Sequence, residues 1–176
     1  AVHCISLNSW HGDADDQIED WQYNWLQKDL ENLSDDTQSI FVFLHSPLWK
    51  YATDHPGYKD WEKIHQLLTQ YPVKLVVAGH THEHVWQNRD GIDYLIINSA
   101  GVSKENERDG MFSAFLHVSV KPGREPKYAV IKAGSILPLD VVTPGERTVI
   151  SEYKLNDKSL RITDWQDTGK FQTTIT

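Results

Sequence analysis

The chain has 176 residues, of which 39% are hydrophobic, and it carries a formal net charge of -8. A chain of this length and composition forms one domain, or the larger part of one, and can build an ordinary core, which excludes a disordered protein. The acidic balance argues against general nucleic-acid binding, because phosphate backbones select basic surfaces. No apolar run approaches the roughly 18 residues of a membrane-spanning helix. The single cysteine, Cys4, excludes an intrachain disulfide framework and is expected to be buried.

Strand patterns and helix patterns alternate in the first half of the chain. Apolar runs typical of buried strands alternate with amphipathic segments typical of helices. In chain order, the predicted elements are a strand at 2–7, a helix at 18–33, a strand at 39–44, a helix at 61–71 and a strand at 73–78. We expect the tryptophans and isoleucines of both helices to lie in the core. This alternating order predicts an α/β layer.

Strand patterns and turns dominate the second half. Arg89-Asp90-Gly91 separates strand-like stretches at 84–88 and 92–98, which predicts a hairpin. Further strands are predicted at 111–120, 127–133, 148–155 and 160–165. Thr143-Pro144-Gly145 marks a boundary, so we expect residues 1–142 to form the main domain and residues 143–176 a small β-strand appendage.

Histidines follow two of the predicted buried strands. His45 comes directly after the strand at 39–44, and Gly79-His80-Thr81-His82 follows the strand at 73–78. In an open α/β sheet, ligands bind beyond the carboxyl ends of the strands. Because residues two apart in an extended chain point to the same side, His80 and His82 can each reach one metal of a pair about 3.5–4 Å apart. Gly79 is expected to permit unusual backbone angles and a close approach of other groups.

Each of these histidines also has a structural interpretation. The chain contains nine histidines, so a lone H-x-H arises easily by chance. A histidine after a strand is also often a hydrogen-bonding group of the framework. The combination favours metal binding, because both motifs end buried strands and a helical segment separates them. His84 continues the spacing and could support the ligands, although we expect it to face solvent or its hairpin partner.

The two motifs resemble the last two motifs of the calcineurin-like metallophosphoesterases. They read F-L-H-S-P-L-W at 43–49 and V-V-A-G-H-T-H at 76–82. The resemblance covers roughly residues 1–120. It implies the C-terminal half of an α/β/β/α sandwich with mixed sheets. It further implies that His45 and His80 bind one metal ion, that His82 binds the other, and that metal-activated water hydrolyses a phosphomonoester or phosphodiester.

Other motifs of that family are missing. The sequence has no D-x-H and no G-N-H, and G-D-x-x-D occurs only as the string at 12–16. Asp13 is a candidate ligand in this string, but the string opens a predicted helix, where carboxylates commonly cap the helix in solvent. Three histidines without a bridging carboxylate can hold one ion but not a pair, since the repulsion between two cations is uncompensated.

The resemblance implies that the intact protein holds two divalent ions (Mn, Fe, Zn or similar), and this chain alone is expected to hold one or none. A missing N-terminal half or a second chain would supply the other ligands. The predicted function is metal-dependent hydrolysis of phosphate esters. The alternative is a non-catalytic module of the same fold that binds a partner or a single metal ion, which the missing motifs favour for this polypeptide alone.

Overall fold

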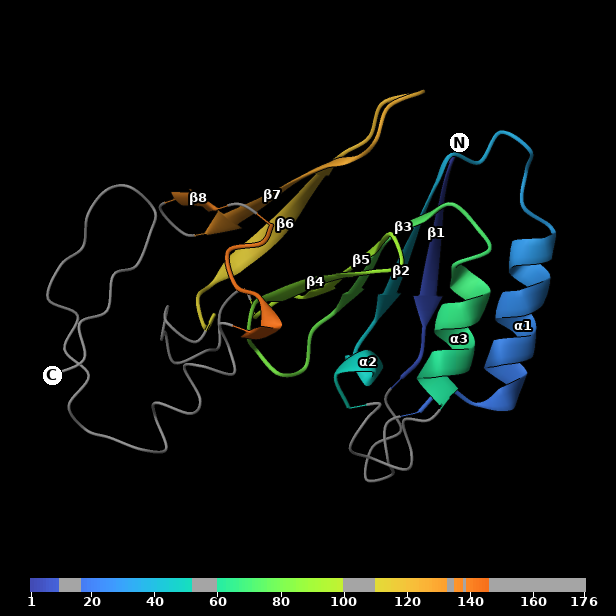
Figure 1. Ribbon diagram of the computed structural model, residues 1–176, viewed down its shortest axis with the longest axis horizontal. Coiled ribbons are helices and arrows are strands. Elements are labelled where there is room, and N and C mark those ends of the chain that lie inside the picture. Colours follow the sequence, from blue (N-terminus) through green and yellow to red (C-terminus); the bar gives the residue numbers. More distant parts are fainter. Residues whose placement is uncertain (10–16, 52–59, 100–109, 133–134, 138, 146–176) are drawn as a thin grey trace, which may run out of the picture.

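A five-stranded sheet forms the centre of the molecule (Figure 1). The computed structural model describes residues 1–9, 17–51, 60–99, 110–132, 135–137 and 139–145. The strand order in this sheet is β1-β2-β3-β5-β4. The parallel strands are β1 (Val2–Leu7), β2 (Ser39–Leu44), β3 (Val73–Ala78) and β5 (Ile92–Ile96), and β4 (Val85–Arg89) is antiparallel to β5.

The predicted hairpin is confirmed between β4 and β5. Asp90 and Gly91 form its turn, with φ angles of 52° and 83°. Positive φ at both positions is what a two-residue hairpin turn of type I′ requires, and an acidic residue followed by glycine supplies it readily. The turn is tied to the helical layer, because buried His65 contacts the Asp90 carboxylate through Nε2 at 2.8 Å and the Tyr94 hydroxyl through Nδ1 at 2.7 Å.

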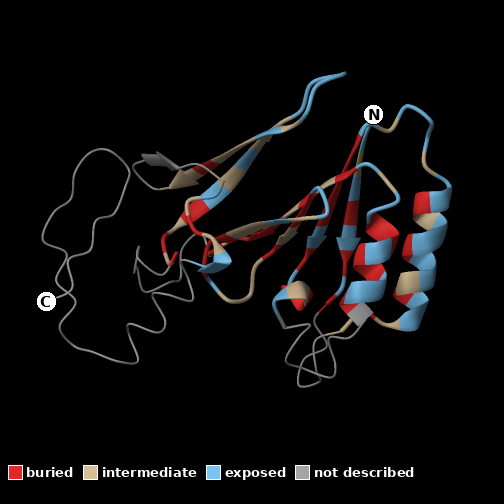
Figure 2. Cartoon of the chain, in the orientation of Figure 1, coloured by how far each residue is buried: buried red, intermediate tan, exposed pale blue. Residues whose placement is uncertain are grey.

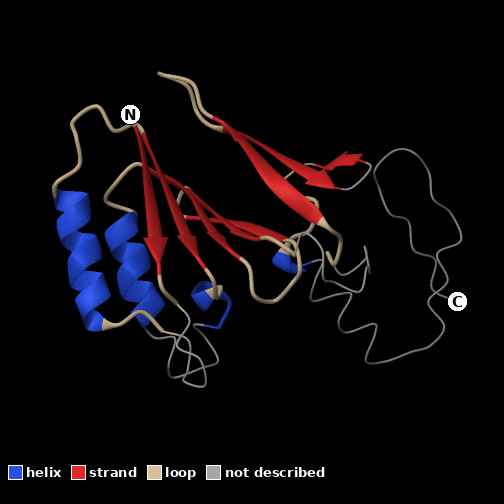
Figure 3. Ribbon diagram, turned by 180° about the vertical axis from the view of Figure 1, so that it is seen from behind, coloured by secondary structure: helices blue, strands red, loops and turns tan. Residues whose placement is uncertain are grey.

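Helices α1 (Asp20–Glu31) and α3 (Asp60–Leu68) cover one face of this sheet, and the short α2 (Leu48–Tyr51) follows β2 (Figures 1 and 3). The buried side chains of α3 include Trp61 and Ile64, as predicted. For the first helix, the prediction that the tryptophans lie in the core was wrong, because Trp21 and Trp25 are 62% and 44% exposed, whereas Ile18, just before α1, is buried as predicted. The helix also begins two residues later than expected. No helix in the described part of the chain is long and apolar enough to cross a membrane.

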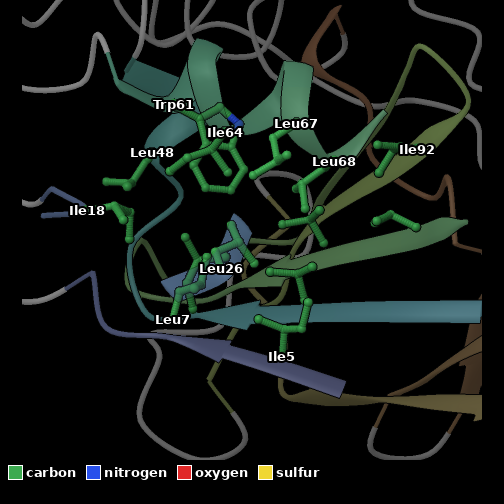
Figure 4. Packing of buried hydrophobic residues seen from close by; sticks show 14 of the residues in the cluster. Ile5, Leu7, Ile18, Leu26, Leu48, Trp61, Ile64, Leu67, Leu68 and Ile92 are labelled. Carbon is green, nitrogen blue, oxygen red and sulfur yellow. The ribbon is translucent and has the colours of Figure 1, made fainter. Parts of the chain in front are cut away.

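The main core lies between these helices and the sheet (Figures 2 and 4). In α1 the buried positions recur every four residues, at Gln22, Leu26 and Leu30, and this spacing places them on one side of the helix. The strands contribute alternate side chains, among them Ile5 and Leu7 of β1. Burial of these side chains fixes the register of the strands and so the position of their carboxyl ends.

A second, antiparallel sheet packs on the other face of the first. It consists of β6 (Ala114–Ser119), β7 (Lys127–Lys132) and β8 (Ser135–Leu137), in that order. Leu116 and Tyr128 pack against a buried cluster of Phe41, Leu75 and Leu95 from the first sheet. The described residues thus form helix, sheet and sheet layers, which confirms the predicted α/β class with mixed sheets.

One prediction about the edge strand is wrong, and the predictions about the end of the chain are not tested. Cys4 is exposed, contrary to expectation, because its side chain lies on the face of edge strand β1 opposite the buried Ile5 and Leu7. The strands predicted at 148–155 and 160–165 lie outside the described residues. The domain boundary at residue 143 stays a prediction.

Candidate functional site

The predicted ligands His45 and His80 meet at one edge of the five-stranded sheet. His45 follows β2 directly, and His80 follows β3 after Gly79. Because β2 and β3 are adjacent and parallel, their carboxyl ends share this edge. Nε2 of His45 lies 3.1 Å from Nδ1 of His80, and the two rings meet edge to face with centroids 5.0 Å apart. The backbone joins the same loops, because the amide of Gly79 donates to the carbonyl of His45 at 2.9 Å.

The backbone after β3 is not extended. His80 and His82 have φ angles of 66° and 54°, in the left-handed region that residues with a side chain rarely adopt. The argument that alternation in an extended chain turns both imidazoles to one side was therefore wrong. His82 is exposed and, among the described residues, has no hydrogen bond to either of the other two imidazoles. The expectation for Gly79 was also wrong, since a Cβ there would meet its nearest neighbour at an ordinary 3.7 Å.

His84 is fully buried and does not face solvent. Its Nε2 donates to the carbonyl oxygen of Leu139 at 2.8 Å, and its ring stacks on Phe112 with centroids 5.6 Å apart. Burial lowers the pKa of His84, although the bond to Leu139 opposes this shift. The ring thus ties the loop after β3 to the segment after β8. Asp13 lies outside the described residues.

Gly110 packs against the loop between β3 and β4, at His84. The carbonyl oxygen of Gly110 accepts hydrogen bonds from the His84 amide at 2.8 Å and from Nδ2 of the buried Asn98 at 3.0 Å. Gly110 has a φ angle of 73°, and a Cβ there would lie 2.6 Å from the carbonyl oxygen of His84. Only glycine fits this close approach, and no local pattern in the sequence predicts it.

An ion pair links the two histidine loops and was also missed from the sequence. Lys50 of α2 contacts the carboxylate of Glu83, which directly follows His82. The side chain of Glu83 is 2% exposed and that of Lys50 is 36% exposed. The two residues are 33 positions apart, so their pairing depends on the tertiary fold and has no signal in local sequence.

A hollow of about 640 Å³ lies beside His45, at the ends of β1 and β2. Its lining includes the exposed aromatic rings of Trp21 and Phe43 together with the polar side chains of Ser6 and Asn8. The imidazole of His45 therefore lies next to a place where part of a small molecule could sit.

Residues 4–84 match the family model of the calcineurin-like phosphoesterases. The predicted resemblance is confirmed over this stretch. The chain is 33% identical over 86 residues to purple acid phosphatase 22 of Arabidopsis thaliana, and 30% identical over 93 residues to purple acid phosphatase 23 of the same plant. These alignments cover 47% and 50% of this chain but 19% of each relative, so the chain spans about a fifth of the curated relatives that it matches. Among solved structures, Vps29 of Entamoeba histolytica in complex with Zn²⁺ is similar at 13% identity and a TM-score of 0.34, with 77% of this chain and 95% of that chain covered.

The calcineurin-like stretch contains a pair of donors suited to one divalent cation. Two nitrogens bound to Zn²⁺ at about 2.0–2.1 Å with tetrahedral geometry lie roughly 3.3 Å apart, close to the separation of His45 Nε2 and His80 Nδ1. Buried hydroxyls of Ser46 and Thr81, in the same loops, have no hydrogen-bond partner among the described residues. No third His, Cys, Asp or Glu of the described ranges joins the two imidazoles in a group that could hold a metal ion. The two imidazoles thus supply two of the four ligands that a tetrahedral cation takes.

Proposed function

We propose that this chain contributes part of the metal centre of a phosphoesterase. In this proposal His45 and His80 bind one divalent cation, and His82 binds a second cation when the remaining ligands are present. The calcineurin-like family and the purple acid phosphatase relatives indicate metal-dependent hydrolysis of phosphate esters at the level of the family. The assignment of individual ligands is ours.

The separation of 3.1 Å between the nitrogens of His45 and His80 carries the proposal. Two buried strands hold the imidazoles in place, so little conformational entropy is lost when they bind a cation. At this separation one ring donates a hydrogen and the other accepts it. A cation bound between the rings needs the lone pairs of both facing nitrogens, Nε2 of His45 and Nδ1 of His80. The ring that donates must therefore release its hydrogen or carry it on its other nitrogen.

The remaining ligands are proposed to come from outside the described residues. A pair of divalent cations supplies an activated water molecule and neutralises the charge on the phosphoryl oxygens. Neutral imidazoles do not offset the repulsion between two such cations, so in this proposal carboxylates complete the site. They would come from residues of this chain outside the described ranges, such as Asp13, from an N-terminal half or from a second chain. The hollow beside His45 would receive the organic part of the phosphomonoester or phosphodiester.

Elemental analysis after loading with Zn²⁺ or Mn²⁺ tests the ligands. We expect about one ion or less per chain, and a clear loss of binding in His45→Ala and in His80→Ala. His117→Ala is the matched control, because His117 is exposed on β6, on the second sheet. Equal metal content in all four proteins would refute the assignment.

Phosphatase activity should be measured with a chromogenic aryl phosphate on the full-length protein. We expect hydrolysis that requires added metal and is lost in His80→Ala but kept in His117→Ala. Activity that survives His80→Ala would sink the catalytic assignment.

A non-catalytic, single-metal module is the second candidate function. The observation that favours it is that no carboxylate joins His45 and His80 within the described ranges. Metal bound at one ion per chain, with no hydrolysis by the full-length protein, would support this alternative.

A further inference from the structure

The ion pair between Lys50 and Glu83 connects the two loops that carry the proposed ligands. Lys50 lies five residues after His45, in the short helix α2. Glu83 directly follows His82 and is almost completely buried. A buried carboxylate is disfavoured unless it is paired and hydrogen-bonded, and the ammonium group of Lys50 provides Glu83 with an ion pair.

The loop before Glu83 needs such a restraint. Both His80 and His82 adopt the left-handed backbone conformation, which is unfavourable for residues with a side chain and persists only where the surroundings impose it. On the far side of Glu83, the His84 amide is bonded to the Gly110 carbonyl and the His84 ring to Leu139. The Lys50–Glu83 pair connects the same loop to α2, on the side of His45.

We propose that Lys50 and Glu83 are positioning residues that hold the His80–His82 loop against the His45 loop in the arrangement that binds metal. This inference rests on the proposed function, because it takes the imidazoles as ligands. Neither residue is assigned a contact with metal or substrate. Both act through the backbone conformation at His80 and His82, and the pair ensures that the nitrogens of His45 and His80 stay within reach of one cation.

The test compares Lys50→Met with Lys50→Arg. Methionine keeps a long apolar side chain but removes the charge, whereas arginine keeps the charge on a side chain that is already one third exposed. Glu62→Gln is the control, because Glu62 forms an ion pair with Arg89 away from the histidine loops. Each protein is titrated with Zn²⁺ by calorimetry at a temperature where circular dichroism shows it folded. Amide hydrogen exchange of residues 80–83 is measured without metal.

We expect Lys50→Met to weaken Zn²⁺ binding by about tenfold or more, as loss of a group that orients a ligand typically does, and to speed amide exchange at 80–83. Lys50→Arg should retain the affinity and the slow exchange, and Glu62→Gln should match the wild type. If Lys50→Met folds poorly, Glu83→Gln replaces it, because glutamine keeps the shape of the side chain without its charge.

Wild-type affinity in a folded Lys50→Met protein would overturn the inference, since a purely structural pair changes the melting temperature but not the affinity of the folded state. Failure of the proposed function has a different signature, in which the wild type and its His45→Ala and His80→Ala variants bind Zn²⁺ equally poorly or equally well. In that case amide exchange alone decides whether the pair holds the loop: unchanged exchange in Lys50→Met refutes it.

Discussion

Replacement of Gly110 by alanine tests the packing behind the proposed metal loop. The φ angle of 73° places this residue in the left-handed region, which costs a residue with a Cβ about 1–2 kcal/mol. The added Cβ would also lie 2.6 Å from the carbonyl oxygen of His84, so the two segments must separate. Separation strains the bonds that the Gly110 carbonyl accepts from His84 and Asn98, each worth about 0.5–1.5 kcal/mol. We expect the free energy of unfolding to fall by about 2–5 kcal/mol, measured by urea denaturation with tryptophan fluorescence.

Gly123→Ala is the matched control for this substitution. Gly123 has a similar φ angle of 67°, but no heavy atom lies within 4 Å of an added Cβ. Its replacement should therefore cost only the conformational part, about 1–2 kcal/mol. Equal losses in the two variants would show that the close approach between Gly110 and His84 does not contribute, and would refute the reasoning.

The same denaturation assay checks three further expectations. His65→Ala should lower the free energy of unfolding by about 2–4 kcal/mol, because it removes a hydrogen-bond partner of the buried Tyr94 hydroxyl and opens a cavity, and it should leave Zn²⁺ binding unchanged. Trp61→Ala should lose about 3–5 kcal/mol, whereas the exposed Trp21→Ser should change stability by no more than about 0.5 kcal/mol; comparable losses would contradict the assignment of the helix faces. The hydrogen bond from Arg89 holds the pKa of Glu62 below its ordinary value of 4.5, so the pair stabilises the fold above that pH and loses its effect as the pH falls through the folded-state pKa. Glu62→Gln should thus reduce stability by less than about 1 kcal/mol near neutral pH, and a difference that persists in strong acid would argue against an electrostatic origin.

The strands at 2–7, 39–44 and 73–78 were predictable from the sequence because each is a short apolar run bounded by polar residues. The face of α1 was not, because two sets of residues share the same helical spacing. Trp21 and Trp25 form one set, and Gln22, Leu26 and Leu30 form the other. Both sets contain large apolar side chains, so hydrophobicity and spacing do not decide between them. The structure buries the second set, because Gln22 exchanges two hydrogen bonds with the backbone of Asn8, at 2.6 and 2.8 Å, and so satisfies the polar groups where β1 ends.

The convergence of His45 and His80 was predictable for a similar reason. Each follows a buried parallel strand, and neighbouring parallel strands end at one edge of the sheet. The orientation of His82 was not predictable, since it depends on a backbone conformation that tertiary contacts impose on the loop. The Lys50–Glu83 pair and the close approach at Gly110 likewise join segments that lie far apart in the sequence, so local patterns do not indicate them.

In the complete site, the imidazoles and the remaining ligands would have different roles in binding the cations. Neutral nitrogens at the strand ends can fix where a cation sits, because rigid strands hold them, but they add no negative charge to retain a second cation nearby. The one buried carboxylate among the described residues near them, that of Glu83, is already neutralised by Lys50. The charge needed to hold two cations must then come from the parts of the site proposed to lie outside these residues. In this proposal the described residues would set the geometry of the metal centre, while the ligands outside them would determine whether the centre holds one ion or two.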